Sequence, residues 1–359
     1  MQTLAAYSFI VAALLCGASA LDYTPQSSTL TASGAEQLPL FYNLSEPHPV
    51  RSSHGVNSFW MSSFVRTTDN GSYLVMAHTS FQGGVGYTQR GGILSLDEPL
   101  GSYPRFYQTS FVAAVAKNNH TNIEPLNLTL SSGAFGLESV GPATDPSSPL
   151  RFFSRVPEAK FDVVFDMSAP VILNAGLGSW LWAGAIQNQW SMPAGRTRGS
   201  FVVNDSVLTI DPDQSFTWYD RQWGATQVPT FTWFGLHLAP PDESTGKIYF
   251  SIWNWVDPVD GNKSFATVQS QSGISSVVPV VEFSASEENV FHSQATNSTY
   301  PLEYDISLLD GTHLHISSVR PDQEYVITNT TSGFYSGVME VTGSYTGYGV
   351  ADILPPVSG

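Results

Sequence analysis

The residues best suited to chemistry lie in the segment SFTWYDRQWG, residues 215–224. Charged residues make up only 12% of the chain, yet Asp220 and Arg221 stand side by side here among two tryptophans and a tyrosine. A carboxyl group walled by aromatic rings loses hydration, which raises its pKa and can keep it protonated near neutral pH. A protonated Asp220 could act as a general acid or donate a hydrogen bond to a carbonyl oxygen. Alternatively, Asp220 accepts backbone N–H bonds or pairs with a distant arginine, and only links parts of the fold.

A β-strand would separate the two charges, because successive side chains of a strand point to opposite faces. Asp220 would share a face with Trp218 and Gln222, and Arg221 would point to the other side. The two charged groups would then meet different surroundings and need not pair with each other.

Tryptophan is concentrated around this segment. Eight of the nine tryptophans lie between Trp180 and Trp255, and the exception is Trp60. The indole ring is large and its N–H needs a hydrogen-bond partner, so two interpretations stay open. The tryptophans form a shared core where two barrels meet, or they wall a pocket for a flat or polyene-like ligand. Both can hold, since ligand sites favour domain junctions.

The elements that must position these residues are predicted to be β-strands. Residues 230–240 (TFTWFGLHLAP) and 247–257 (KIYFSIWNWVD) alternate between two faces, and no segment keeps a 3.6-residue apolar period. Hairpin turns are predicted at Asn-Asp 204–205 and at Asp-Gly 310–311. We therefore predict an all-β chain built of barrel or sandwich sheets.

The N-terminal segment, residues 1–20, predicts the compartment. Its hydrophobic run ends in Ala18-Ser19-Ala20, a pattern typical of signal peptidase cleavage, although the segment has no Lys or Arg. A membrane anchor is the alternative, but the run is shorter than a spanning helix needs. The only cysteine, Cys16, lies inside this segment, so the mature chain is predicted to contain no thiol, disulfide or cysteine nucleophile.

N-glycosylation sequons agree with a secreted protein, and the net charge bears on its partners. Eight N-x-S/T sequons begin at Asn43, Asn70, Asn119, Asn127, Asn204, Asn262, Asn297 and Asn329. The formal net charge is −16 and no basic cluster occurs, which argues against binding to nucleic acid or to an anionic membrane. We expect an N-glycosylated protein of the secretory pathway.

Several common catalytic and cofactor motifs are missing from the sequence. It contains no Walker A loop, no Rossmann fingerprint, no H-E-x-x-H and no G-x-S-x-G elbow, so no cofactor is predicted. His313 and His315 would share a strand face, but no third metal ligand is evident and no metal site is predicted. Residues 257–264 (DPVDGNKS) are interpreted as a turn rather than a calcium loop. His54 lies near Trp60 and is either a solvated loop histidine or part of a site.

Two motifs resemble a known family. The stretch TIDPDQSFTWYDRQWG, preceded by GSWLWAGAIQNQWSMPAG at residues 178–195, resembles the AttH-type family of hydroxyneurosporene-synthase-like proteins. It looks most like the secreted fungal branch that includes kievitone hydratase. The resemblance spans most of the mature chain and is sharpest between residues 174 and 224. It implies two lipocalin-like antiparallel β-barrels in tandem, which we place at residues 21–212 and 213–359, with a ligand pocket between or within them.

The family motif D-H-x-W-G of carotenoid hydratases, which supplies their proposed acid, matches Asp220 to Gly224. A tyrosine two positions earlier in those proteins corresponds to Trp218. An upstream His-x-Trp corresponds to residues 188–190, so that Asn188 replaces the histidine, and Arg221 replaces the second histidine. By this resemblance, a titratable pair has become a hydrogen-bonding set, which weakens acid-driven hydration without excluding it.

The family carries out more than one chemistry without a cofactor. Its hydratases add water across a prenyl-type double bond, which needs a strong acid, and related fungal Diels–Alderases close rings, which needs positioning and hydrogen-bond donors. The first hypothesis is a Diels–Alder-type or hetero-Diels–Alder-type cyclisation of a hydrophobic polyketide or terpenoid in fungal secondary metabolism. The second is a hydratase that adds water to a prenyl double bond. The third is a non-catalytic carrier of hydrophobic metabolites.

The predicted site joins polar groups to an aromatic wall. Asp220, Asn188 and Gln189 are predicted to be catalytic. The predicted substrate contacts are Trp60, His54, Trp190, Trp218, Tyr219, Gln222 and Trp223. The expected partner is a hydrophobic small molecule such as a polyene, a terpenoid or a prenylated aromatic compound.

Overall fold

The computed structural model describes residues 55–82, 86–97, 108–116, 121–124, 127–131, 133–140, 148–166, 171–224, 230–241, 246–326 and 333–355. The predicted signal peptide, Cys16 and His54 lie outside the described residues. So do three of the sequon asparagines, Asn43, Asn119 and Asn329. Within the described part, no helix has the length and apolar character needed to cross a membrane.

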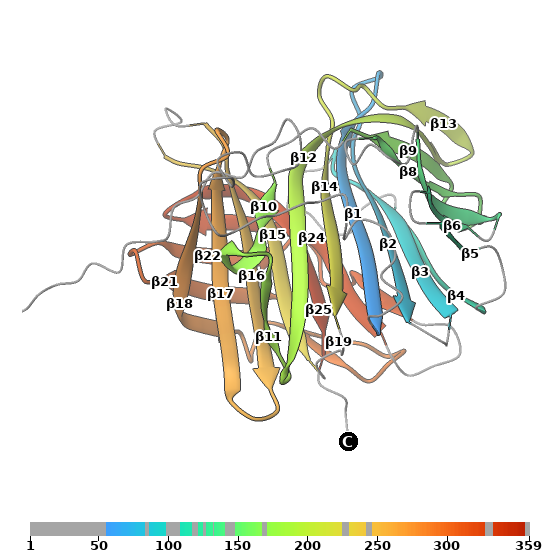
Figure 1. Ribbon diagram of the computed structural model, residues 1–359. Coiled ribbons are helices and arrows are strands. Elements are labelled where there is room, and N and C mark those ends of the chain that lie inside the picture. Colours follow the sequence, from blue (N-terminus) through green and yellow to red (C-terminus); the bar gives the residue numbers. More distant parts are fainter. Residues whose placement is uncertain are drawn as a thin grey trace, which may run out of the picture.

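The described chain is almost entirely β-structure, arranged in two large sheets that lie side by side (Figure 1). The 14-stranded first sheet contains β1 (Val56–Arg66), β2 (Ser72–Gln82), β3 (Gly86–Ser95), β4 (Gln108–Ala116), β5 (Thr121–Glu124), β6 (Asn127–Ser131), β7 (Phe135–Ser139), β8 (Leu150–Ser154), β9 (Phe161–Phe165), β10 (Ile172–Leu173), β11 (Ser179–Trp182), β12 (Ala185–Val203), β13 (Ser206–Thr209) and β14 (Phe216–Gly224). The 9-stranded second sheet contains β15 (Phe231–Ala239), β16 (Ile248–Asp257), β17 (Gly261–Ser270), β18 (Ser275–Ala285), β21 (Glu303–Leu308), β22 (His313–Ser318), β23 (Glu324–Val326), β24 (Gly333–Gly343) and β25 (Thr346–Leu354). Two further elements are a small hairpin, β19 (Val290–His292) with β20 (Thr299–Pro301), and a short 3₁₀ turn, η2 (Asn174–Gly176).

The second sheet closes into an eight-stranded barrel, and the first sheet is curled. Closure comes from the pairing of β22 with β24, which joins the two ends of the strand order β22-β21-β18-β17-β16-β15-β25-β24. The first sheet runs β4-β3-β2-β1-β14-β12-β9-β8-β7-β6-β5. Its longest strand, β12, pairs with β14 along its first half and with β9 after a bulge between Met192 and Gly195. The all-β, lipocalin-like fold class predicted from the sequence is confirmed.

The chain changes sheet later than the sequence motifs indicated. Residues 213–224 were placed at the start of the second domain, but β14 pairs with β1 and β12 in the middle of the first sheet. The change of sheet falls between Gly224 and Phe231, where the second sheet begins. The WYDRQWG segment is therefore a central strand of the first sheet rather than a link between the two.

The predicted strands and turns are found where the alternation and turn residues placed them. Residues 230–240 and 247–257 contain β15 and β16, and residues 257–261 form the turn between β16 and β17. The β12–β13 turn has positive φ at both Asn204 (48°) and Asp205 (59°), as a tight hairpin requires.

Four sequon asparagines are exposed, namely Asn70, Asn204, Asn262 and Asn297. A fifth, Asn127, lies on β6. Exposed turns are where an attached glycan would meet no steric obstacle.

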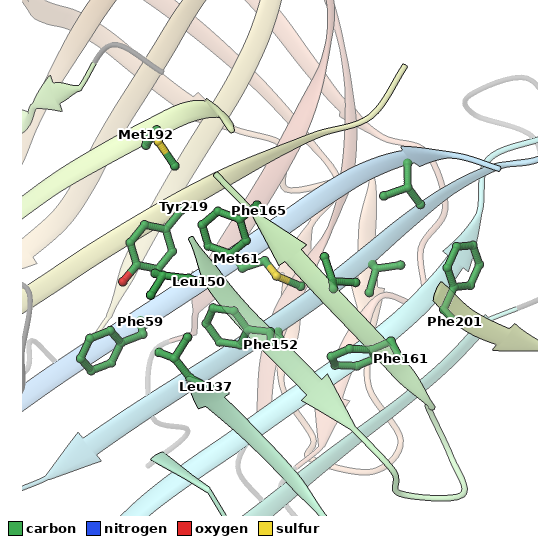
Figure 2. Packing of buried hydrophobic residues seen from close by; sticks show 14 of the residues in the cluster. Phe59, Met61, Leu137, Leu150, Phe152, Phe161, Phe165, Met192, Phe201 and Tyr219 are labelled. Carbon is green, nitrogen blue, oxygen red and sulfur yellow. The ribbon is translucent and has the colours of Figure 1, made fainter. Parts of the chain in front are cut away.

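The hydrophobic core has three parts. Figure 2 shows the first, on the concave face of the first sheet, where Phe59 and Met61 pack among side chains such as Phe152 and Phe165. The second fills the closed barrel. The third lies between the two sheets and contains Trp60, Trp180, Trp182, Trp218, Trp233, Trp253 and Trp255. Most of the tryptophans thus form the contact between the sheets, as the first of the two interpretations expected.

Candidate functional site

Asp220 lies in the contact between the sheets, on a row of side chains that crosses five neighbouring strands. The strand registers place Ser191, Asp220, Trp60, His78 and Arg90 directly beside one another on β12, β14, β1, β2 and β3. Side chains of directly paired residues project to the same face of a sheet. The row therefore brings a carboxyl, an imidazole and a guanidinium group to the face that packs against the second sheet.

The carboxyl group of Asp220 keeps its proton up to nearly neutral pH. Its side chain is buried, with 5% of the residue exposed, and this burial raises the pKa of the carboxyl to about 7. Hydrogen bonds from Ser191, Trp218 and Gln189 oppose the rise because they stabilise the carboxylate, and the charge of Asp352 adds to it. The result is a group that can exchange its proton at physiological pH, which is what general acid–base catalysis requires.

The second sheet supports the ring that holds Asp220. The indole Nε1–H of Trp218 donates to Oδ1 of Asp220 over 2.8 Å. Across the interface, Gly235 of β15 leaves room for this ring, because a Cβ at that position would lie 3.1 Å from Cε2 of Trp218 and 2.7 Å from Cη2 of Trp233. Trp233 also meets Trp60 edge-on at a centroid distance of 4.9 Å. Aromatic rings from both sheets therefore fix the place of the carboxyl group.

Several buried indole donors of the interface find no acceptor within the described residues. The indole nitrogens without a hydrogen-bond partner in the described structure include those of Trp60, Trp180, Trp182, Trp253 and Trp255. Their rings are in contact, for example Trp182 with Trp253 at 5.2 Å and Trp180 with Trp253 at 5.8 Å. An unsatisfied buried donor costs about 1–3 kcal/mol, so such a group is unusual in a folded protein. Oxygen atoms of a bound small molecule would satisfy these donors.

A buried ion pair joins the two sheets beside Asp220. Arg90 Nη2 donates to both carboxylate oxygens of Asp352 on β25 at 2.7 Å, and Arg90 Nη1 donates to Ser336 Oγ at 2.7 Å. Its Nε–H donates to Nδ1 of His78 over 3.1 Å, so His78 carries its proton on Nε2 and donates it to Ser58 Oγ. Burial and the charge of Arg90 lower the pKa of His78 well below its usual range. His78 is therefore uncharged, and Arg90 joins the first sheet to the second through its ion pair with Asp352.

A second neutral histidine lies on the other side of Trp218. The His237 ring contacts the Trp218 ring at a centroid distance of 5.4 Å, and its Nε2–H donates to the Pro193 carbonyl over 2.8 Å. Burial lowers the pKa of His237 to about 3. Its Nδ1 is consequently an unprotonated acceptor, and it has no partner in the described structure.

An open cavity of about 310 Å³ lies at one edge of the interface, and Phe64, Phe216 and Tyr348 are among its lining residues. The same three rings contact the ring of His237 at 4.7–6.1 Å. One layer of aromatic side chains therefore separates this cavity from the buried polar groups. Its size reaches the lower end of what small-molecule pockets occupy.

Several other predicted site residues lie on the opposite face of the first sheet, whereas Gln222 shares the face of Asp220 and pairs with Gln189 on β12 and Ser58 on β1. Trp190, Tyr219 and Trp223 belong to the concave core in which Figure 2 shows Tyr219. Arg221 lies there too, with its guanidinium 4.3 Å from the ring centroid of Phe59 and with Nη2 donating to Asn57 Oδ1 over 2.7 Å.

Asn188 shares that face and is held by its neighbours. Ser179 Oγ donates to its Oδ1 over 2.6 Å, and its Nδ2 donates to the Trp223 carbonyl over 3.2 Å. The structure thus separates the predicted catalytic residues, with Asp220 and Gln189 on the interface face and Asn188 on the concave face. The two residues of β12 that reach Asp220 are Gln189 and Ser191, rather than Asn188 and Trp190.

Several polar residues of this interface were not predicted from the sequence. They are His78, Arg90, Asn174, Ser191, His237, Ser251 and Asp352. Alternation within residues 230–240 puts His237 on the same face as Trp233, and this was the available sequence signal for that residue. His78 and Arg90 reach the row only through the registers of β1, β2 and β3, which no local pattern specifies.

Comparison with known proteins places the chain near fungal hydratases and dehydratases. No family model matches the sequence. The chain is 28% identical over 332 residues to kievitone hydratase of Fusarium solani subsp. phaseoli, covering 88% of this chain and 87% of that protein. It is also 28% identical over 333 residues to the dehydratase asqC of Emericella nidulans, covering 88% of this chain and 89% of that protein.

Solved structures show the same likeness. The crystal structure of kievitone hydratase from Nectria haematococca is 29% identical, has a TM-score of 0.78, and the match covers 93% of this chain and 98% of that one. A putative AttH from Nitrosomonas europaea has a TM-score of 0.70 at 12% identity, covering 88% and 97% of the two chains. The resemblance recognised from the motifs around Asp220 is thereby confirmed. The two curated relatives are named as a hydratase and a dehydratase, which supports an enzymatic role for this chain.

Proposed function

We propose that this chain is a cofactor-independent enzyme that adds water to, or removes water from, a hydrophobic small molecule, with Asp220 as the proton-transfer group. The observation that carries the proposal is the buried Asp220 carboxyl, whose pKa is about 7 and which is held by Trp218 between the two sheets. The names of the hydratase and dehydratase relatives support the same reaction class.

Hydration is favoured here over the Diels–Alder-type ring closure that was the first hypothesis from the sequence motifs. The motif changes at Asn188 and Arg221 were the reason to expect weakened acid chemistry. Both residues lie on the concave face, so neither change removes a group from the immediate surroundings of Asp220. On the interface face the Asp220 carboxyl group is buried, and this burial raises its pKa so that it can act as an acid near neutral pH.

The proposed chemistry uses one carboxyl group in both directions. Protonated Asp220 gives its proton to one carbon of a double bond and becomes a carboxylate. The π electron pair of the double bond forms the new C–H bond, and a tertiary cation remains at the other carbon. The faces of nearby indole rings stabilise such a cation. Water adds to the cation and loses a proton to the Asp220 carboxylate, which restores the acid. Dehydration is the same sequence run backwards.

A Diels–Alder-type cyclisation is the second candidate, and one observation favours it. The N–H of Trp60 is buried beside Asp220 and has no partner among the described residues, so it could polarise a carbonyl or quinone methide oxygen in a held substrate. In that reaction Asp220 would bind the substrate and its proton would not be consumed. Polyketides, terpenoids and prenylated aromatic compounds all fit an aromatic interface of this kind.

Labelled water distinguishes the two reactions. The protein is incubated in H₂¹⁸O with a prenylated phenol, and separately with a quinone methide and a terpene, and the products are weighed by mass spectrometry. A product that gains one labelled water supports the hydratase, and an unlabelled product with the substrate mass or the summed mass of two substrates supports the cyclase. Saturable binding of all probes without conversion would instead support a carrier.

We also propose that the protein is secreted and N-glycosylated. The exposed positions of Asn70, Asn204, Asn262 and Asn297 support this proposal, together with the apolar run of residues 1–20. Protein purified from a eukaryotic host should begin at Leu21 and lose mass on treatment with a glycosidase. An N-terminus at Met1 and an unchanged mass would count against both parts.

A further inference from the structure

A chain of hydrogen bonds runs from the second sheet to Asp220. Trp233 Nε1–H donates to Ser251 Oγ over 3.0 Å, and Ser251 Oγ–H donates to Oδ1 of Asn174 over 2.6 Å. Nδ2 of Asn174 then donates to Ser191 Oγ over 2.9 Å, and Ser191 is hydrogen-bonded to Asp220. Asn174, Ser191 and Ser251 are each fully buried.

The direction of this chain is fixed from its first member. An indole N–H can only donate, so Ser251 must accept from Trp233 and turn its single proton toward Asn174. The amide oxygen of Asn174 therefore faces Ser251, and its NH₂ group faces Ser191. Each group in this series of hydrogen bonds therefore has only one orientation in which every donor meets an acceptor.

Ser191 is consequently left with one possible direction for its proton. Its oxygen accepts from Nδ2 of Asn174, and Nε2 of Gln189 approaches it at 3.5 Å. Because N–H groups already approach the lone pairs of this oxygen, the hydroxyl proton of Ser191 points to Asp220. A donor to a carboxyl group stabilises the charged form.

We propose that Asn174 is a positioning residue that makes Ser191 a hydrogen-bond donor to Asp220 and so sets the pH at which this acid loses its proton. The inference rests on the proposed role of Asp220 in catalysis. By this proposal, the second sheet influences the pKa of Asp220 in the first sheet through the hydrogen bonds of Asn174 in the η2 turn.

The other charged and titratable groups around Asp220 do not take part in this chain. They are His78 on β2, Arg90 on β3, His237 on β15 and Asp352 on β25. Arg90 and Asp352 are joined to each other, and both histidines are neutral. A change at Asn174 leaves all four in place.

The sharpest variant is Asn174→Asp, which keeps the shape of the side chain but replaces the NH₂ donor with an oxygen acceptor. Ser191 would turn its proton toward the new carboxyl group, and Asp220 would lose a donor and gain an acidic neighbour. Ser191→Ala removes the same donor directly. The matched control is Thr267→Val, which removes the hydrogen bond from the Ala175 N–H to Thr267 Oγ1 and disturbs the same turn without touching the chain.

The titration of Asp220 is read without substrate, from the infrared band of its protonated carboxyl group. Each protein is measured against its own Asp220→Asn counterpart, so that the difference spectrum isolates this one group. We expect the midpoint to rise by about one pH unit in both Asn174→Asp and Ser191→Ala, and to stay unchanged in Thr267→Val. Should Asn174→Asp not fold, Ser251→Ala carries the test, with a smaller rise expected because it frees the Asn174 amide to turn.

Two results would overturn the inference. An unchanged midpoint in Ser191→Ala would show that the chain does not reach Asp220. A shifted midpoint in Ser191→Ala with none in Asn174→Asp or Ser251→Ala would show that Asn174 does not orient the serine. Loss of the proposed activity is a separate outcome, since the shift can appear in a protein that converts no substrate.

Discussion

The indole of Trp218 and the carboxyl of Asp220 form a hydrogen-bonded pair two residues apart on one face of β14, at 2.8 Å. A strand places residues i and i+2 on the same face, so the pair is produced by local geometry. Its burial comes from the second sheet, whose Gly235 leaves room for the indole ring. The acid thus depends on both sheets, although it belongs to one.

Asp220→Asn is expected to change how stability varies with pH. The folded-state pKa of about 7 lies above the ordinary value of 3.8, so the folded protein binds more protons than the unfolded chain between these values. Stability from this group is full below about pH 4 and falls as pH rises toward 7. At about 1.36 kcal/mol per unit, the wild type should lose about 4 kcal/mol across this window, and Asp220→Asn should lose none of it. Urea denaturation at pH 5 and pH 8 covers about two pH units of this window and should show a wild-type loss of about 2.7 kcal/mol. Parallel pH dependence of the two proteins would contradict the prediction.

Gly235→Ala is expected to impair the acid from the opposite sheet. The added methyl group would press on the rings of Trp218 and Trp233, and the Trp218–Asp220 hydrogen bond would lengthen. Activity should fall about tenfold or more, with stability lower by about 1–3 kcal/mol. Gly261→Ala is the control for glycine replacement, because a Cβ there meets nothing within 4 Å, although its φ of 73° adds local strain. Equal activity losses in both variants would argue against a specific role for Gly235.

The ion pair between Arg90 and Asp352 is expected to hold the sheets together rather than to catalyse. Removing one partner leaves a buried charge alone, so Arg90→Leu should lower the free energy of unfolding by about 3–5 kcal/mol. The double variant Arg90→Leu/Asp352→Leu should recover much of this loss, because no lone charge remains. Calorimetry of the wild type, Arg90→Leu, Asp352→Leu and the double variant decides the matter, and a double variant that loses as much stability as the two single variants together would contradict this role.

Much of the fold and part of the site could be predicted from the sequence. Alternation in residues 230–240 and 247–257 identified β15 and β16, and the same rule placed Asp220, Trp218 and Gln222 on one face. These features depend on neighbours in sequence, which is why local reasoning reached them. Asp220 as the central titratable group also followed from its aromatic surroundings.

The rest depended on long-range pairing. His78 and Arg90 reach Asp220 only because β1, β2 and β3 pair in one particular register. The motif match at residues 188–190 put Asn188 beside the acid, whereas the β12–β14 register puts Gln189 and Ser191 on that side. A shift of one residue exchanges the two faces of a strand, and the sequence alone carries too little information to exclude it.

Trp60→Phe tests whether an unpartnered indole N–H serves the substrate. The change keeps an aromatic ring in contact with Trp233 but removes the indole N–H donor. If the N–H binds a substrate oxygen, kcat/KM should fall about 10- to 100-fold. Trp255→Phe, on β16, is the comparison, because its indole N–H also lacks a partner in the part of the chain that the structure describes but lies on the other sheet. An unchanged kcat/KM in Trp60→Phe would remove this residue from the site.

The central claim is that Asp220 transfers a proton while water is added or removed, and an isotope experiment tests it most directly. Wild type and Asp220→Asn are incubated with a prenylated phenol in H₂¹⁸O, and product mass is followed against pH. The account predicts one ¹⁸O per product with the wild type, a rate that falls as pH rises through about 7, and a loss of at least about 100-fold in Asp220→Asn. Full activity in Asp220→Asn, or a product formed without ¹⁸O, would contradict it.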